Sequence, residues 1–317
     1  MRYIHIPGTE LKTSAICLGG GNLGSTNNQQ ESFTLLDSFI EQGGNFLDTA
    51  KIYADWLPGE RSISEKTLGA WMHQRGNRHQ VIVATKGAHP DLAAMHIPRL
   101  SPGEIVADLE ASLQHLGADM IDLYWLHRDD PARPVEEIID TLNSQVIAGK
   151  IRYFGCSNWR AGRIQAAQAY AKAHGLMGFA GNQMLWSLAH IDMDANPDKT
   201  LVNMDAESFE YHKSSGLAAI PYSSQAGGLF NKMARGSGTS GGGMYPIVEN
   251  EARFKHIQKL SDETGLSITQ IVLGYMLSQP FAVIPIVGCH TLTQLKDSLS
   301  AAEVCLLPSQ VAFLDRT

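Results

Sequence analysis

Residues 81–86 read VIVATK, residues 101–117 read SPGEIVADLEASLQHLG, and residues 120–127 read MIDLYWLH. The first and last runs are short and mostly apolar, as in strands of a parallel sheet that is buried on both faces. The middle run is a helix with a clear start, because Ser101 and Glu104 form a capping box. A buried strand, a helix and a second buried strand in this order predict a parallel α/β fold.

The same alternation continues along the chain in both directions. Strands are expected at residues 14–18, 45–48, 81–86, 120–126, 151–156, 178–182, 217–221 and 281–286. Helices are expected from residue 29 and over residues 62–73, 102–116, 135–147, 161–174, 205–213, 249–263, 268–279 and 292–301. Eight strand–helix units and one extra helix, with no linker to divide them, favour a single (β/α)8 TIM barrel over residues 1–317.

Two ordinary domains would also fit a length of 317 residues, but the count of units favours the barrel. Residues 2–6 and 11–12, on either side of Pro7 and Gly8, predict an N-terminal β-hairpin that covers the bottom of the barrel. The glycine-rich segment 236–243 is either a flexible surface loop or a mobile flap over a ligand at the carboxyl end of the barrel.

Composition excludes several classes of function. Hydrophobic residues make up 44% and charged residues 18% of the chain, which is typical of a soluble globular protein. The net charge is −7 and no basic run occurs, so we expect neither nucleic acid nor a membrane as a partner. The four cysteines are far apart and no signal peptide is recognisable, which favours the cytoplasm. The oligomeric state stays open.

One glycine motif is misleading. Residues 19–24 match GxGxxG after a strand, as in a dinucleotide-binding Rossmann unit. In that unit the last glycine opens a helix, whereas residues 25–28 are polar loop residues here, and no strand ending in an acidic residue follows about 20 residues later. A tight loop between a strand and a helix explains the glycines better.

Ionisable side chains end three of the expected strands. Asp48 ends the second strand, Tyr53 follows in the same loop, Lys86 ends the third strand and His127 ends the fourth. Each alone has a plain structural explanation, such as a capping aspartate or a solvated lysine. In a barrel, however, the carboxyl ends of the strands form the active site, so the set predicts a catalytic site.

With these residues the chain resembles the aldo-keto reductase superfamily. The matching pieces, in family order, are DTAKIY at 48–53, Lys86, IDLYWLH at 121–127, GKIRYFG at 149–155, Ser157–Asn158, Gln183, Tyr222–Ser223 and the closing Ile284–Pro285. The resemblance implies a (β/α)8 barrel that binds a nicotinamide cofactor, with Asp48, Tyr53, Lys86 and His127 as catalytic tetrad. Tyr53 would donate the proton, and Lys86 would lower the pKa of Tyr53. Asp48 would orient Lys86, and His127 would bind the substrate oxygen.

The resemblance also implies the cofactor residues. They are Gly21, Asn22, Ser157, Asn158, Gln183, Tyr222, Ser223, Gln225, Gly227, Gly288, Cys289, Thr291, Gln294 and Ser298. Members that prefer NADPH often carry cations where this chain has Gly288 and Gln294, although His290 and Lys296 are close in sequence. Because His290 and Lys296 can supply positive charge near the extra phosphate, we expect NADP(H) rather than NAD(H) as cofactor. Because the usual cations are absent, we expect only a small difference in affinity between the two cofactors. The expected substrate contacts are Leu23, Trp56, His89, Arg128 and Trp186.

The sequence thus predicts an NAD(P)(H)-dependent oxidoreductase of aldehyde, ketone or sugar carbonyls, acting on a small molecule. An alternative is a cofactor-binding regulatory subunit that senses redox state, as in the potassium-channel β subunits that share this barrel. The complete tetrad favours the enzyme. A metal-dependent hydrolase is a weaker alternative, since no second histidine at a strand end joins Asp48 and His127, and we expect no bound metal.

Overall fold

The structure is a computed structural model that describes residues 1–237 and 243–316. Its main sheet has eight parallel strands in the order β10, β3, β4, β5, β6, β7, β8, β9. These strands are β3 (Cys17–Gly19), β4 (Phe46–Asp48), β5 (Ile82–Gly87), β6 (Ile121–Leu126), β7 (Ile151–Ser157), β8 (Gly181–Gln183), β9 (Ala218–Ala219) and β10 (Ile286–Val287). The predicted (β/α)8 barrel is confirmed.

The last strand closes the barrel and is shorter than the expected 281–286. Val283 forms a parallel bridge with Ala219 on one side, and Ile286 and Val287 pair with β3 on the other. Pro285, between these contacts, has no N–H to donate, but its carbonyl oxygen accepts from the backbone N–H of Cys17 at 3.0 Å.

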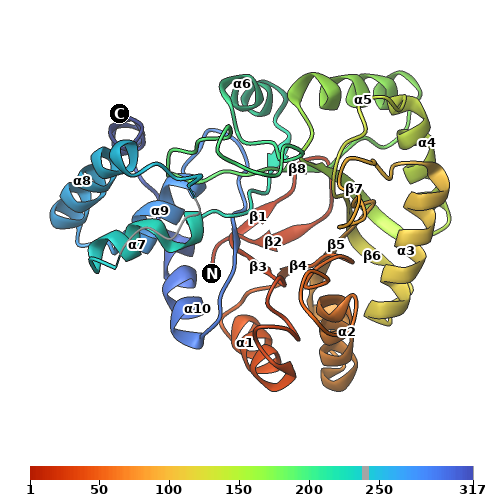
Figure 1. The fold of residues 1–317 in the computed structure, drawn as a ribbon, viewed down its shortest axis with the longest axis horizontal. Helices are drawn as coiled ribbons and strands as arrows, with labels where there is room; N and C mark the ends of the chain where they lie inside the picture. The colour runs from red at the N-terminus through yellow and green to blue at the C-terminus, as the bar shows by residue number, and fades with distance from the viewer. Residues whose placement is uncertain (238–242, 317) are drawn as a thin grey trace.

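Helices surround the strands, as Figure 1 shows. They are α1 (Gln29–Glu41), α2 (Ile63–Arg75), α3 (Pro102–Leu116), α4 (Val135–Ile147), α5 (Ala161–Ala173), α6 (Ala206–Ser215), α7 (Leu229–Ala234), α8 (Ile247–Thr264), α9 (Ile268–Leu277), α10 (Leu292–Leu299) and α11 (Pro308–Leu314). Helices α7 and α11 were not expected from the sequence. The loop or flap expected at 236–243 falls largely on residues 238–242, which lie outside the described residues.

The N-terminal hairpin closes the amino end of the barrel, as predicted. Its strands are β1 (Tyr3–His5) and β2 (Lys12–Ser14), paired antiparallel. The backbone N–H of Ser14 donates to Asn45 Oδ1 at 2.6 Å, just before β4. Ile6 and Leu11, from the turn between the two strands, are fully buried among Phe46, Leu123 and Trp125 inside the barrel. Burial of this apolar surface fixes the hairpin over the opening.

Every second residue of a strand points into the barrel, so the inward-facing residues lead from the apolar interior to the site. Ala84 and Leu123 belong to the apolar interior. Two residues further along β5 is Lys86, and the same step along β6 reaches Trp125, which pairs with Lys86. The inward positions of β5 therefore change from apolar Ala84 to ionisable Lys86, whereas β6 keeps an apolar residue, Trp125, beside Lys86.

Among residues 1–237 and 243–316, no helix is long and apolar enough to cross a membrane.

Candidate functional site

Lys86 connects the expected tetrad at the carboxyl end of the barrel. Its Nζ donates to Asp48 Oδ2 at 2.5 Å, to the Thr49 carbonyl oxygen at 2.8 Å and to Tyr53 Oη at 2.8 Å. The ammonium has three N–H donors, so all of them are in use. Since the Tyr53 oxygen accepts from Lys86, its own proton is free to point elsewhere, and Tyr53 lines a cavity.

Burial and the neighbouring charges together determine the protonation of Tyr53 and Lys86. Burial raises the pKa of Tyr53 above its ordinary value; the Lys86 ammonium opposes this and Asp48 adds to it. Burial lowers the pKa of Lys86, but Asp48 and Tyr53 outweigh it and leave this pKa raised. Lys86 is therefore a cation. Lys86 lowers the pKa of Tyr53, as expected. The net change is nevertheless a raised pKa, because desolvation has the larger effect. Tyr53 is a neutral phenol, the form that donates a proton.

Two histidines line the cavity together with Tyr53. The His127 ring lies 5.9 Å from the Tyr53 ring and 4.7 Å from the His89 ring, both edge to face. Burial, followed by the charge of Arg128, lowers the pKa of His127 well below its ordinary value. The same two causes lower the pKa of His89 to about 4. Both imidazoles are thus neutral near pH 7, so each has one N–H donor and one acceptor.

These side chains line a cavity of about 330 Å³. Its other walls include Trp56, which is 56% exposed at the rim, and Arg128. Arg128 is held in place by Thr200 Oγ1 at 2.7 Å and Asp198 Oδ2 at 3.1 Å, both from the segment between β8 and α6. No sequence motif had singled out this segment.

Two of the expected substrate contacts lie elsewhere. Leu23 is buried in the apolar core and lines neither this cavity nor the neighbouring groove. Trp186 lines a separate cavity and stacks on Phe281 with ring centroids 6.1 Å apart. Both side chains find apolar neighbours inside the protein, which the sequence could not distinguish from a place at the barrel mouth.

The inner end of the cavity carries amide groups that fit a nicotinamide. Gln183 Nε2 donates to Asp48 Oδ1 at 2.7 Å, while its Oε1 is buried and has no hydrogen-bond partner. A buried acceptor of this kind calls for a donor from a ligand, and a carboxamide NH₂ is one. Tyr222 Oη donates to Asn158 Oδ1 at 2.6 Å, which orients the Asn158 amide, and Ser157 lies beside it. All four residues line the cavity.

A groove of about 480 Å³ continues from this cavity, and both are lined by Tyr53 and Ser223. Seven further expected cofactor residues line it: Gly21, Asn22, Gln225, Gly227, Gly288, Gln294 and Ser298. A Cβ added at Gly227 or Gly288 would meet no atom within 4 Å, so the groove is open where a ligand backbone could lie. Gln225 Nε2 donates to Ser298 Oγ at 3.0 Å across it.

Two expected cofactor residues do not line the groove. Cys289 is buried, with its Sγ 3.9 Å from Ser298 Oγ. Thr291 caps α10, where its Oγ1 accepts from the backbone N–H of Gln294 at 3.2 Å. Both are adjacent in sequence to His290, which does line the groove.

The groove also has cations that the sequence analysis missed. Lys232 and Arg235 come from α7 and the residue that follows it, and they line the groove together with His290 and Gln294. The only signal in the sequence was two cations three residues apart, in a connection with no predicted helix. Without the helix there was no reason to place them at the cofactor groove.

Comparison with known proteins gives a consistent family. The family model described as "Aldo/keto reductase family" matches residues 15–317. The uncharacterized oxidoreductase YrpG of Bacillus subtilis is 31% identical over 315 residues, covering 96% of this chain and 92% of its own. An aryl-alcohol dehydrogenase (NADP(+)) of Phanerodontia chrysosporium is 29% identical, and the match covers 98% of this chain and 84% of that relative. A norsolorinic acid reductase of Emericella nidulans is 28% identical, and the match covers 97% of this chain and 79% of that relative.

Proposed function

Because the chain belongs to the aldo/keto reductase family and is an oxidoreductase, we propose that it catalyses NADP(H)-dependent reduction of aldehyde, ketone or sugar carbonyls, or the reverse oxidation of alcohols. The observation that carries this proposal is the single ammonium of Lys86 shared by Asp48 and Tyr53. This arrangement places a neutral phenol beside a fixed cation in a cavity large enough for a small molecule.

Each residue has a distinct task in this reaction. Gln183, Asn158 and Ser157 would hold a nicotinamide, which when bound would supply the hydride for the carbonyl carbon or accept it from the alcohol. Tyr53 donates its proton to the carbonyl oxygen as negative charge develops there. Lys86 stabilises the resulting phenolate by Coulomb attraction at 2.8 Å, and Asp48 keeps Lys86 charged. Neutral His127 donates a hydrogen bond to the same oxygen and fixes its direction.

The cofactor preference follows from the groove. Lys232 and Arg235 line the same groove as Gln294 and His290, the part of the chain that the family resemblance assigns to the adenosine half of the cofactor. Cations in this groove favour a cofactor with an extra phosphate, that is NADP(H). They take the place of the cations absent at Gly288 and Gln294, and one relative bears NADP(+) in its name.

The substrate class follows from the cavity rim. Trp56 offers an exposed ring face, and Leu92, which also lines the cavity, is 36% exposed. Such a rim suits an aromatic carbonyl compound, consistent with relatives named for aryl alcohols and norsolorinic acid. An aromatic ring can equally stack on the face of a sugar.

A spectroscopic screen tests the proposal. Benzaldehydes, aliphatic ketones and aldose sugars are each incubated with NADPH or NADH, and the absorbance of the reduced nicotinamide is followed. We expect oxidation of NADPH with an aromatic aldehyde, faster than with NADH. Absence of turnover with every carbonyl compound and every alcohol, although NADPH binds, would contradict the proposed function.

A further inference from the structure

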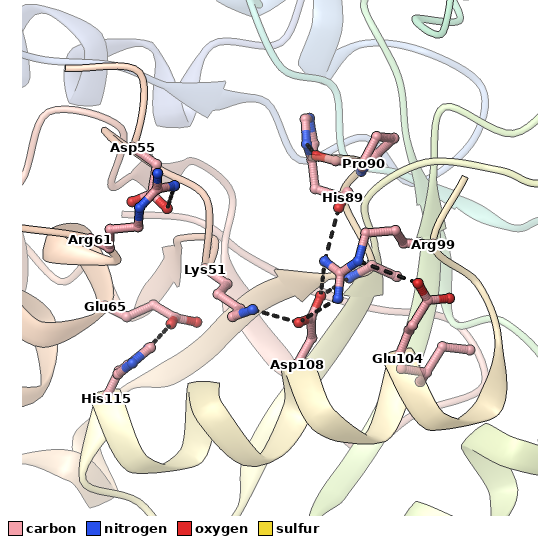
Figure 2. A network of polar contacts seen from close by, with 12 residues as sticks. Lys51, Asp55, Arg61, Glu65, His89, Pro90, Arg99, Glu104, Asp108 and His115 are labelled. Atoms are coloured by element: carbon pink, nitrogen blue, oxygen red, sulfur yellow. Dashed lines mark hydrogen bonds and ion pairs between the residues drawn. The ribbon is translucent and has the colours of Figure 1, made fainter. Parts of the chain in front are cut away.

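A buried carboxylate behind the substrate cavity joins three segments of the barrel mouth. Asp108, on α3, is 2% exposed and lines neither the cavity nor the groove. Its Oδ1 accepts from Lys51 Nζ at 2.5 Å and from Arg99 Nη2 at 3.2 Å. Its Oδ2 accepts from Arg99 Nη1 at 3.0 Å and from the backbone N–H of Ala88 at 2.8 Å. Figure 2 shows Lys51 and Arg99 converging on this carboxylate from two different loops.

Each donor belongs to a segment that carries a residue of the site. Lys51 lies two positions before Tyr53 in the loop after β4, and its backbone N–H donates to the Lys86 carbonyl oxygen at 3.0 Å. Ala88 lies directly before His89 at the end of β5. Arg99 Nη1 also donates to the His89 carbonyl oxygen at 3.1 Å. Asp108 therefore ties the Tyr53 loop to the His89 loop.

The backbone of Ala88, just after β5, has a conformation that requires a hydrogen-bond partner outside the strand. Ala88 has a φ of 59°, in the left-handed region that is unfavourable for a residue with a Cβ. Its hydrogen bond to Asp108 holds it there. The end of β5 also packs closely on α3, since a Cβ at Gly87 would lie 2.8 Å from Asp108 Cβ and 1.8 Å from Tyr124 Oη. The direction in which His89 leaves the strand thus depends on Asp108.

The charges make the carboxylate hard to replace. Burial raises the pKa of Asp108, but the hydrogen bonds from Lys51 and Arg99 outweigh burial and leave this pKa below its ordinary value. Asp108 is therefore an anion between two cations. Without its charge, Lys51 and Arg99 would repel each other, and the two loops would separate.

We propose that Asp108 is a positioning residue: it holds the Tyr53 and His89 loops at the separation at which both face the substrate carbonyl. This inference rests on the proposed function, because the quantity it controls is the rate of carbonyl reduction. It adds a residue outside the cavity that touches neither substrate nor cofactor. A displacement of about 1 Å at a reacting group can lower a rate by about a hundredfold.

The chain offers a matched control at the other end of the same strand. Asp122 is also buried, at 5% exposure. It accepts from the backbone N–H of Val83 at 3.0 Å and pairs with Arg78 at 2.8 Å and Arg152 at 3.3 Å. Both carboxylates thus bind one N–H of β5 or its extension and two arginine or lysine side chains. Only Asp108 lies at the carboxyl end, where barrel enzymes have their chemistry.

The test compares Asp108→Asn with Asp122→Asn by single-turnover oxidation of saturating NADPH with an aromatic aldehyde. The rate constant reports only folded protein, whereas a lower folded fraction reduces only the amplitude. We expect both variants to lower the urea midpoint. We expect Asp108→Asn alone to slow the single turnover, by about tenfold to a hundredfold, with the Kd for NADPH unchanged within about twofold.

A second variant covers the case in which Asp108→Asn does not fold. Arg99→Met leaves Asp108 with Lys51 and Ala88 but releases the His89 carbonyl oxygen, so we expect a smaller slowing in the same assay. A wild-type rate constant in either folded variant, from a wild type that reduces the aldehyde, would overturn the positioning role. A wild type that reduces no carbonyl would instead overturn the proposed function, and this inference with it.

Discussion

At the scale of single residues, the proposed chemistry depends most on Lys86. It is almost completely buried, yet all three of its N–H groups have partners, so its charge is tolerated. It favours the phenolate of Tyr53, whereas burial favours the phenol. This balance suits an enzyme that works in both directions, with the phenol donating a proton in reduction and the phenolate accepting one in oxidation.

Replacing Lys86 by Met should therefore separate the two directions. Removing the cation raises the pKa of Tyr53 further, since an opposite charge at this distance typically shifts a pKa by about 1–3 units. Since Tyr53 must be a phenolate to accept the proton, we expect the rising limb of the pH profile for alcohol oxidation to move to higher pH by about one unit or more. Lys150→Met, which removes an ion pair with Glu110 on the surface, is the control. An unmoved limb in an active Lys86→Met variant would refute the electrostatic role.

Removal of Lys86 also leaves Asp48 buried without its cation. If the single variant does not fold, Asp48→Asn combined with Lys86→Met removes both charges and allows the same profile to be measured. Because Asp48 itself raises the pKa of Tyr53, we expect the limb of the double variant to move to higher pH by less than that of the single variant.

The strand ends let the sequence predict part of the site. Asp48, Lys86 and His127 each follow an apolar run, so the fold alone brings them to one rim. Asp108 and Asp198 lie inside a helix and in a loop, where an aspartate is common and nothing marks it. Whether Trp186 packs inside or faces the mouth depends on neighbours such as Phe281, which are distant in sequence.

At the scale of elements, the long helices and buried strands were predictable because their apolar pattern and caps are local. Helix α3 has the same bounds in sequence and structure, since Ser101, Pro102 and Gly117 mark its ends. Helix α7 was missed because it has only six residues and follows glycines that have positive φ. A helix this short is stabilised by packing, here of Leu229 and Phe230, and not by its own sequence.

The position of α7 beside the groove leads to a prediction about the affinity for NADPH. Arg235→Ala should weaken NADPH binding by about tenfold, which is the lower range for one charge-assisted hydrogen bond to a phosphate, and should leave NADH binding unchanged within about twofold. Quenching of tryptophan fluorescence measures both Kd values. Lys213→Ala, an exposed lysine on α6, is the control. An equal effect on the two cofactors would mean that Arg235 does not lie at the extra phosphate.

At the scale of the whole molecule, the two ends of the barrel have different tasks. The amino end is filled by the hairpin and apolar side chains, and it stabilises the fold. The carboxyl end keeps several buried polar groups, among them two neutral histidines whose rings pack edge to face. Burying groups that would be charged in water costs stability, so the site should be the acid-sensitive part of the protein.

Acid titration tests this distribution of stability. The pKa of His89 is about 4 in the folded protein, below its ordinary value of 6.5. Between these values the unfolded chain binds more protons, so the free energy of unfolding falls as the pH decreases from 6.5 towards 4. By pH 5 this group alone accounts for a loss of about 2 kcal/mol.

We therefore expect His89→Gln to lose less stability than the wild type between pH 7 and pH 5, measured by urea unfolding. His79→Gln, which changes an exposed histidine, should show the wild-type pH dependence. Equal losses in the wild type and His89→Gln would show that His89 does not stay neutral in the folded protein.

The claim that most of this account depends on is that Tyr53 donates the proton in carbonyl reduction. Its most direct test is the single-turnover rate of NADPH oxidation with an aromatic aldehyde in Tyr53→Phe, with Tyr153→Phe at the amino end as the control. The account predicts an unchanged Kd for NADPH and a rate constant lower by about 10²–10⁴-fold, the usual contribution of general acid catalysis. A wild-type rate constant in Tyr53→Phe, with hydride transfer shown to limit the rate by a deuterium isotope effect, would contradict it.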